Sequence, residues 1–213
     1  MVMRRQVHEP EGIADHAALV LPLDALDRTL LPIVGGKGAN LGELIRVGFS
    51  VPGGFCVTTA AYVQVSAALE PILAEMATLH NDSARLAELA STARSALQQA
   101  AMPSTLAQAI LDAYQEMGEN VAVAVRSSAT AEDLSFASFA GQQETYLNVV
   151  GSEALLRAVQ DCWASLWTER AVSYRQSLGL DQRTVSLAVV VQRLIPSEVS
   201  GVLFTANPLT GNL

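Results

Sequence analysis

The chain has 213 residues, of which 50% are hydrophobic and 16% are charged, and its formal net charge is −8. This apolar content is enough for a real buried core, in one large domain or two small ones. No run approaches the roughly 20 uninterrupted apolar residues that a membrane helix needs, and the acidic balance argues against a nucleic-acid surface. The first 16 residues lack the layout of a signal peptide. We therefore expect a soluble cytoplasmic protein, with neither a membrane nor a nucleic acid as its partner.

The cysteines and the acidic residues give no sign of a metal centre. Cys56 and Cys162 lie far apart without metal-type spacing, so neither a disulfide framework nor a zinc cluster is indicated. We expect both thiols to be small buried groups. No histidine has the partner spacing of a catalytic triad. The adjacent carboxylates of Glu132 and Asp133 point apart more often than together, so we assign no metal ligand there.

Glycine turns and helical periodicity organise the first half of the chain. An edge strand is expected at residues 19–26, where a proline interrupts it, and a glycine turn at 35–36 leads into a short helix. A strand around 55–57 precedes a further helix. Apolar residues then repeat with a period near 3.6 in residues 84–101 and again in 104–117. These two segments predict an antiparallel pair of helices.

The second half of the chain is richer in predicted strands. A strand at residues 145–150 is followed by a long helix that begins at Ser152 and continues beyond residue 170. Two apolar runs near the end, on either side of residues 196–200, predict a β-hairpin. The expected fold class is α+β, that is mixed α/β, with helices clustered in the first half and a mostly antiparallel sheet in the second.

The segment 121–149 carries the densest set of candidate functional side chains. The apolar run at 121–125 predicts a short buried strand, and Arg126 follows at its expected end. Three hydroxyl residues come directly after it: Ser127, Ser128 and Thr130. A guanidinium beside hydroxyls and exposed amides suits a planar oxyanion such as phosphate. The alternative is an ion pair between Arg126 and Glu132 or Asp133 across the loop.

Four other positions are candidates for the same site. Lys37 lies between glycines that allow close backbone approach ahead of a helix, where a phosphate could bind, although an exposed turn explains the pattern equally well. Gly141 and Thr145 lie in a segment that suits a flap over phosphates, or a simple hairpin turn. Gln192 interrupts an apolar strand, and its amide must pair with a backbone group, the preferred reading, or with the edge of a base.

Five segments, taken in order, resemble the N-terminal nucleotide-binding domain of phosphoenolpyruvate synthases, pyruvate phosphate dikinases and rifampicin phosphotransferases. They are VGGKGANLGEL, VPGGFCVTTAAY, VRSSATAEDLSFASFAGQQETYLNV, CWASLWTERAVSYR, and VVVQRLI followed by SGVLFTANPLTGN. The resemblance implies an ATP-grasp type fold, in which two α/β lobes hold ATP. It implies that Lys37 and Arg126 contact phosphates, that Gly141 and Thr145 belong to the phosphate-covering loop, and that Gln192 lies at the adenine.

The resemblance also implies how the chain is organised and what it does. Residues 1–213 would be the N-terminal part of an ATP-grasp domain, with a glycine-turn and helical region at 33–120 and a sheet-rich lobe at 121–213. In such enzymes ATP phosphorylates a histidine on a separate swivelling domain, which passes the phosphoryl group to a small-molecule acceptor. We expect the Mg²⁺ ligands, the second lobe and the histidine domain to lie beyond this chain, and no phosphotransfer by the isolated chain.

The sequence of a nucleotide-binding domain does not identify the acceptor. Pyruvate, as in a phosphoenolpyruvate synthase, is the preferred expectation, and a rifamycin hydroxyl is the close alternative. A glucan or other dikinase would differ only in its downstream domains. From another class, a non-catalytic ATP-binding module is the alternative.

Overall fold

A computed structural model describes residues 17–79, 82–130, 144–202, 204 and 206–207. The strands are β1 (Val20–Pro22), β2 (Gly54–Val57), β3 (Val123–Ala129), β4 (Thr145–Val149) and β5 (Leu187–Arg193). The α-helices are α1 (Leu31–Arg46), α2 (Thr59–Ser66), α3 (Glu70–Thr78), α4 (Ser83–Gln99), α5 (Ser104–Glu116), α6 (Ser152–Ala164) and α7 (Glu169–Ser177). Short 3₁₀ helices are η1 (Leu23–Ala25), η2 (Arg28–Leu30), η3 (Ala67–Leu69), η4 (Ser165–Trp167) and η5 (Gln182–Thr184).

The five strands form one antiparallel sheet in the order β1-β2-β5-β3-β4. The central strand, β5, is buried from Leu187 to Gln192, which explains why its sequence is a nearly continuous apolar run. Helices and an antiparallel sheet in one unit confirm the expected α+β class. None of the helices in the part of the chain that the structure describes is long and apolar enough to cross a membrane.

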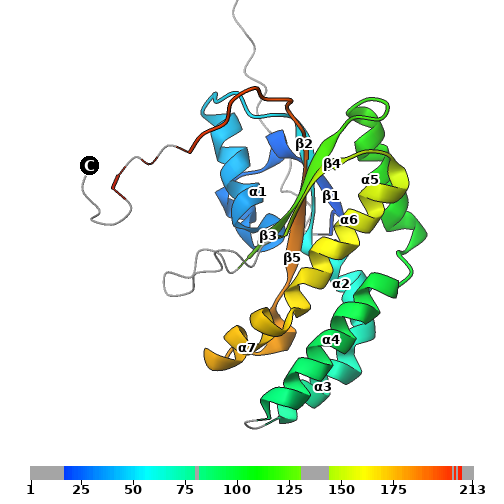
Figure 1. Cartoon of the computed structure of the whole chain (residues 1–213). Helices are drawn as coiled ribbons and strands as arrows, with labels where there is room; N and C mark the ends of the chain where they lie inside the picture. The colour runs from blue at the N-terminus through cyan, green and yellow to red at the C-terminus, as the bar shows by residue number, and fades with distance from the viewer. Residues whose placement is uncertain (1–16, 80–81, 131–143, 203, 205, 208–213) are drawn as a thin grey trace, which may run out of the picture.

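Helices cover the two faces of the sheet unequally (Figure 1). On one face, α1 packs on β5 and β3, and its core includes Val34, Ala188 and Val190. On the other face a larger core holds Val189 and Val191 together with side chains of α2 to α6 and Val172 of α7. Successive residues of a strand point to opposite faces, so β5 supplies both cores by alternation. The sheet therefore separates a thin α1 layer from a thick helical layer.

Two tryptophans pack in the core of the thick helical layer. Trp163 and Trp167 are both fully buried. The indole N–H of Trp167 donates to the Tyr62 hydroxyl at 3.2 Å, and the Tyr62 ring meets the Trp163 ring edge-on with centroids 6.4 Å apart. The guanidinium of Arg175 lies 5.4 Å from the centre of the Trp167 ring. This cluster joins α2, α6, η4 and α7.

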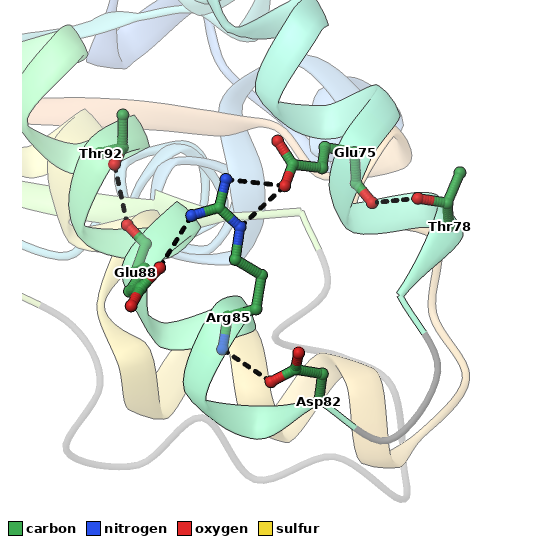
Figure 2. Close-up of polar contacts among 6 residues, drawn as sticks. All are labelled: Glu75, Thr78, Asp82, Arg85, Glu88 and Thr92. Atoms are coloured by element: carbon green, nitrogen blue, oxygen red, sulfur yellow. Dashed lines mark hydrogen bonds and ion pairs between the residues drawn. The ribbon is translucent and has the colours of Figure 1, made fainter.

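Charged side chains on the surface tie α3 to α4 (Figure 2). Arg85 contacts Glu75 of α3 and Glu88 of its own helix, each at 2.8 Å. Asp82 caps α4 by accepting a hydrogen bond from the backbone N–H of Arg85 at 2.9 Å. All these side chains are solvent-exposed, so the ion pairs add little to the stability of the fold.

The expected hairpin near the C-terminus is wrong for the residues that the structure describes. Residues 194–202 follow β5 without forming a strand. β5 already pairs with β2 on one side and with β3 on the other. A hairpin partner must lie next to the strand that it follows, and neither side of β5 is free.

Two helical expectations also differ from the structure. The helices at 84–101 and 104–117 form, but α4 packs along α6 and α7 instead of pairing with α5. Gln98 at the end of α4 donates to Asp161 of α6 at 2.8 Å. The expected long helix after Ser152 is broken at Thr168, whose backbone is extended and whose hydroxyl accepts a hydrogen bond from Ala171 N–H at 3.3 Å. A competing cap therefore starts a new helix there.

Candidate functional site

The glycine turn that precedes Lys37 is a kink inside α1. Gly35 has φ 69° and ψ 173°, so the helix stops there and begins again at Gly36. A Cβ atom at position 35 would lie 2.2 Å from the carbonyl oxygen of Ser128 in β3. Both the positive φ and this close approach require glycine. Lys37 is therefore in the first turn of the restarted helix, where backbone N–H groups lack helical partners.

The hydroxyl of Ser128 holds the kink against the sheet. It accepts a hydrogen bond from the Gly38 N–H at 3.1 Å and donates one to the Val34 carbonyl at 2.8 Å. Ser128 is completely buried. One side chain thus satisfies a donor of the second helical segment and an acceptor of the first. The backbone on both sides of Lys37 is bonded to β3 through this hydroxyl.

Strand register places Arg126 on the same face of the sheet as α1. Arg126 lies opposite Val190 and Ser128 lies opposite Ala188, and both of these β5 residues belong to the core under α1. Directly opposed residues of an antiparallel pair point to the same face, as do residues two apart on a strand. The side chain of Arg126 therefore emerges beside the helix that carries Lys37.

Thr145 and Gln192 share this face. Thr145 begins β4 directly opposite Arg126. Gln192 is two residues beyond Val190 on β5 and lies opposite Ala124. Lys37 and Arg126 are half-buried, Thr145 is exposed and Gln192 is 9% exposed. Three of the five candidate residues thus lie on one face of the sheet, and Lys37 lies on the helix that packs against that face, whereas Gly141 lies outside the described residues.

Two details of the sequence interpretation change. β3 continues to Ala129, so Arg126 lies inside the strand and not at its end. β3 extends past the apolar run because β5 offers it pairing partners as far as Leu187. For Gln192, the structure has the backbone alternative, since its amide nitrogen donates to the Pro52 carbonyl at 3.0 Å. This bond holds the loop before β2; contact with a base stays a prediction.

Neither cysteine is available as a nucleophile. Both are buried, as expected, and burial raises the pKa of the Cys56 and Cys162 thiols well above the usual range. At Cys162 the charges of Glu144 and Asp161 add to that rise and the charge of Lys37 opposes it. Lys37 and Glu144 therefore both lie within electrostatic range of this part of α6.

The donors on the α1 face suit a polyanion. They are one ammonium, one guanidinium and one hydroxyl, which together provide positive charge and hydrogen-bond donors for phosphate oxygens. No three His, Cys, Asp or Glu side chains gather as a metal site in the stretches 17–79, 82–130 and 144–202. The residues described on this face therefore fit a polyphosphate but do not form a ligand set for Mg²⁺.

A separate cavity of about 930 Å³ lies at the other edge of the sheet, bounded by β1, α5 and the end of α1. None of Lys37, Arg126, Thr145 and Gln192 lines it. Its charged lining consists of the guanidinium of Arg193 and three carboxylates, so its net charge is negative and disfavours a polyphosphate; the carboxylates belong to Asp24, Asp112 and Glu116. The cationic face, and not this cavity, is the candidate site for an anionic ligand.

Sequence reasoning missed the structural role of Ser128. It grouped Ser128 with the hydroxyls that could face a phosphate, whereas the structure gives both hydrogen bonds of that hydroxyl to the backbone of α1. The local signals were a double glycine in one segment and a serine directly after an apolar run in another. Neither signal indicates that these two segments meet.

The fold and the cationic face define an α+β domain suited to an anionic ligand such as a nucleotide, and comparison with known proteins gives its family. The sequence model of the pyruvate phosphate dikinase AMP/ATP-binding domain matches residues 31–213. The chain belongs to this family.

Full-length relatives come from two kinds of enzyme. A rifampicin phosphotransferase of Streptomyces sviceus is 52% identical over 198 residues, covering 91% of this chain and 23% of that protein. A phosphoenolpyruvate synthase of Aeropyrum pernix is 49% identical over 205 residues, covering 91% of this chain and 25% of that protein. A rifampicin phosphotransferase of Bacillus cereus is 44% identical over 201 residues, covering 92% of this chain and 23% of that protein. The chain thus spans about a quarter of the length of these relatives.

Proposed function

We propose that this chain is the part of a phosphotransferase that binds the polyphosphate of ATP, and that Lys37 and Arg126 are its two phosphate contacts. The observation that carries the proposal is their common support. The kink that holds Lys37 is bonded to Ser128, and Arg126 is two residues from Ser128 on the same face of β3. A lysine on this helix and an arginine on the sheet face beneath it, in an otherwise acidic chain, would give a local field suited to an anionic ligand.

The remaining candidates take subsidiary roles in this proposal. The Thr145 hydroxyl, across the strand pair from Arg126, donates to a phosphate oxygen, and Gly141 allows the covering loop to approach the phosphates. Gln192, further along the face, contacts the adenine through the amide oxygen, because its amide nitrogen is bonded to Pro52. The proposed architecture is that of an ATP-grasp site, with this sheet as one wall and a second lobe as the other.

Phosphoryl transfer asks a protein mainly for positioning and charge neutralisation. Lys37 and Arg126 supply both without any nucleophile from this chain: they hold the phosphate tail and offset charge that develops on its oxygens. Magnesium bound with ATP would neutralise further phosphate charge, and we place its ligands outside the described residues. The phosphoryl group passes to a histidine on a separate domain and then to a small-molecule acceptor, in the cytoplasm.

Pyruvate is the acceptor that we propose, with a rifamycin as the alternative. Relatives of both kinds align at similar identity, 52% for a rifampicin phosphotransferase and 49% for a phosphoenolpyruvate synthase. Similarity in the nucleotide domain does not separate them, because the acceptor is bound elsewhere. A non-catalytic ATP-binding module would bind ATP and transfer nothing to either acceptor. The isolated chain should likewise transfer nothing.

Calorimetric titration of the natural full-length protein with ATP and Mg²⁺ tests the proposed contacts. Lys37→Ala and Arg126→Ala should each weaken binding by about 1.5 to 3 kcal/mol, the usual contribution of a hydrogen bond to a charged group. Adenosine, which lacks phosphates, should bind both variants as it binds the wild type. Arg157→Ala is the matched control, because Arg157 is an exposed arginine of α6 whose charge pairs only loosely with Glu153 at 3.7 Å.

Absence of ATP binding by the wild type would overturn the proposed function. Normal ATP binding by both Lys37→Ala and Arg126→Ala would overturn the assignment of the site while leaving the function intact. Product analysis with pyruvate and with a rifamycin then identifies the acceptor.

A further inference from the structure

Ser128 is the buried polar residue that joins the two halves of the proposed site. Its side chain is completely buried and its hydroxyl has two backbone partners in α1, at 3.1 Å and 2.8 Å. The acceptor and the donor lie on either side of Lys37 in sequence, at Val34 and Gly38. The hydroxyl therefore fixes the backbone that carries the lysine from both directions.

We infer that Ser128 is a positioning residue for Lys37, an inference that rests on the proposed function. The chain of contacts is short: Arg126 and Ser128 share β3 and one face, and Ser128 bonds to Gly38, the neighbour of Lys37. One hydroxyl thus fixes the backbone around Lys37 to the strand that carries Arg126. Without the hydroxyl, the first turn of the restarted helix loses this bond to the sheet, and the backbone of Lys37 is no longer fixed relative to that strand.

The contact between Ser128 and α1 requires a glycine at position 35. A Cβ there would lie 2.5 Å from the Ser128 hydroxyl and 2.2 Å from the Ser128 carbonyl oxygen. Serine and glycine are therefore a matched pair, in which the small residue on α1 lets the hydroxyl on β3 reach past it to Gly38. A generic role in strand stability does not need this geometry, because the strand bonds of β3 are made by its backbone.

The neighbouring serine provides a matched control. The sequence grouped Ser127 with the hydroxyls beside Arg126, but the structure points it to the opposite face of the sheet, away from the proposed phosphate contacts. It is 1% exposed and its hydroxyl donates to the Glu144 carbonyl at 3.4 Å. Ser127→Ala and Ser128→Ala delete the same atom from equally buried sites. Only the second deletion breaks the link to α1. A difference between the two variants in ATP binding therefore reports on that link and not on the loss of a buried hydroxyl.

The test is a double-mutant cycle on ATP binding by the natural full-length protein, with Ser128→Ala and Lys37→Ala alone and together. Ser128→Ala should weaken ATP binding between about 5- and 100-fold, as expected when a charged contact is misplaced by about an ångström. In the Lys37→Ala background the same change should weaken binding less than about twofold, because the residue through which it acts is gone. Ser127→Ala should leave ATP binding unchanged, and adenosine binding should be unchanged in every variant.

Ser128→Thr keeps the hydroxyl and guards against a variant that fails to fold. If it folds, it should retain most of the affinity that Ser128→Ala loses. Equal and additive losses from Ser128→Ala with and without Lys37 would overturn the inference, as would equal losses from Ser127→Ala. If either result is obtained while Lys37→Ala still weakens ATP binding, the proposed function is not contradicted. If Lys37→Ala has no effect, the proposed site itself has failed.

Discussion

The amide nitrogen of Gly38 lies 3.1 Å from the hydroxyl oxygen of Ser128, although 90 residues separate them in the sequence. This contact brings the glycine kink of α1 onto β3 beside Arg126. It places the helix that carries Lys37 against the face of the sheet that carries Arg126. The proposed role in phosphate binding depends on this contact because it joins the two segments.

The close approach of Gly35 to Ser128 predicts that Gly35→Ala is strongly destabilising. The new methyl group would meet a backbone oxygen at 2.2 Å, and alanine would also have to adopt φ 69°. We expect the free energy of unfolding to fall by about 2 to 4 kcal/mol, measured by urea denaturation.

Gly179 provides the control, because it has φ 67° with nothing within 4 Å of the position of its Cβ. Gly179→Ala therefore measures the cost of a positive φ for alanine without a steric clash. That control should lose only about 1 to 2 kcal/mol. Equal losses would show that the contact with Ser128 is unimportant.

The hydrogen bond from Trp167 to Tyr62 predicts the effect of Tyr62→Phe at neutral pH. Phenylalanine keeps the ring but leaves the buried indole N–H without its acceptor. We expect the free energy of unfolding to fall by about 1 to 3 kcal/mol, the cost of an unsatisfied buried donor. Chemical denaturation at pH 7 measures it, and a loss near zero would mean that the bond contributes nothing.

The same substitution should change the response to alkaline pH. Burial raises the pKa of Tyr62 to about 12 from the ordinary tyrosine value of 10.0. The folded state therefore holds this proton more tightly than the unfolded state does, so the stabilisation is complete below pH 10 and is lost as the pH rises to 12. The advantage of wild type over Tyr62→Phe should shrink across that window, by on the order of 2 kcal/mol. A constant difference between the two unfolding curves would contradict this.

Arg175 should be far more important to stability than Arg170, the other arginine of α7. It is 2% exposed, and it donates to Gln182 and to the Leu166 carbonyl, each at 2.7 Å. Burial lowers its pKa to about 10, so the buried charge is itself a cost that these bonds and the Trp167 ring offset. Arg175→Ala should cost about 3 kcal/mol or more, because it leaves two acceptors and a cavity in the core. Arg170→Ala, at an exposed position of α7, should stay within about 0.5 kcal/mol in the same urea titration.

Local patterns predicted the helices and strands where one periodicity dominates. The limits of α4 and α5 follow the 3.6-residue repeat and the proline between them, and β5 follows its apolar run. The hairpin after β5 was wrong because a strand's partners are a property of the whole sheet. The helix break at Thr168 was not predicted, because the apolar repeat continues across it. The backbone conformation there is determined by the capping hydroxyl of Thr168.

The candidate site could be predicted as a set of residues but not as an arrangement. Glycines around a lysine and an arginine after an apolar run are local signals, and they made Lys37 and Arg126 candidates. The position of Arg126 on the α1 face follows from the register between β3 and β5, which pairs Arg126 with Val190. Register depends on long-range pairing, so no local pattern could supply it. The role of Ser128 was hidden for the same reason.

Competition between ATP and an amine-specific reagent tests the central claim most directly, because Lys37 is the single lysine of this chain. The natural full-length protein is acetylated with and without nucleotide, and peptide mapping by mass spectrometry follows the modification rate at Lys37. Calorimetry confirms saturation in each sample. ATP at ten times its Kd should slow modification of Lys37 by about tenfold, as mass action requires of a group covered by the ligand, and adenosine at equal saturation should not. An unchanged rate at Lys37 with ATP fully bound would contradict the proposal that this ammonium holds the phosphate tail.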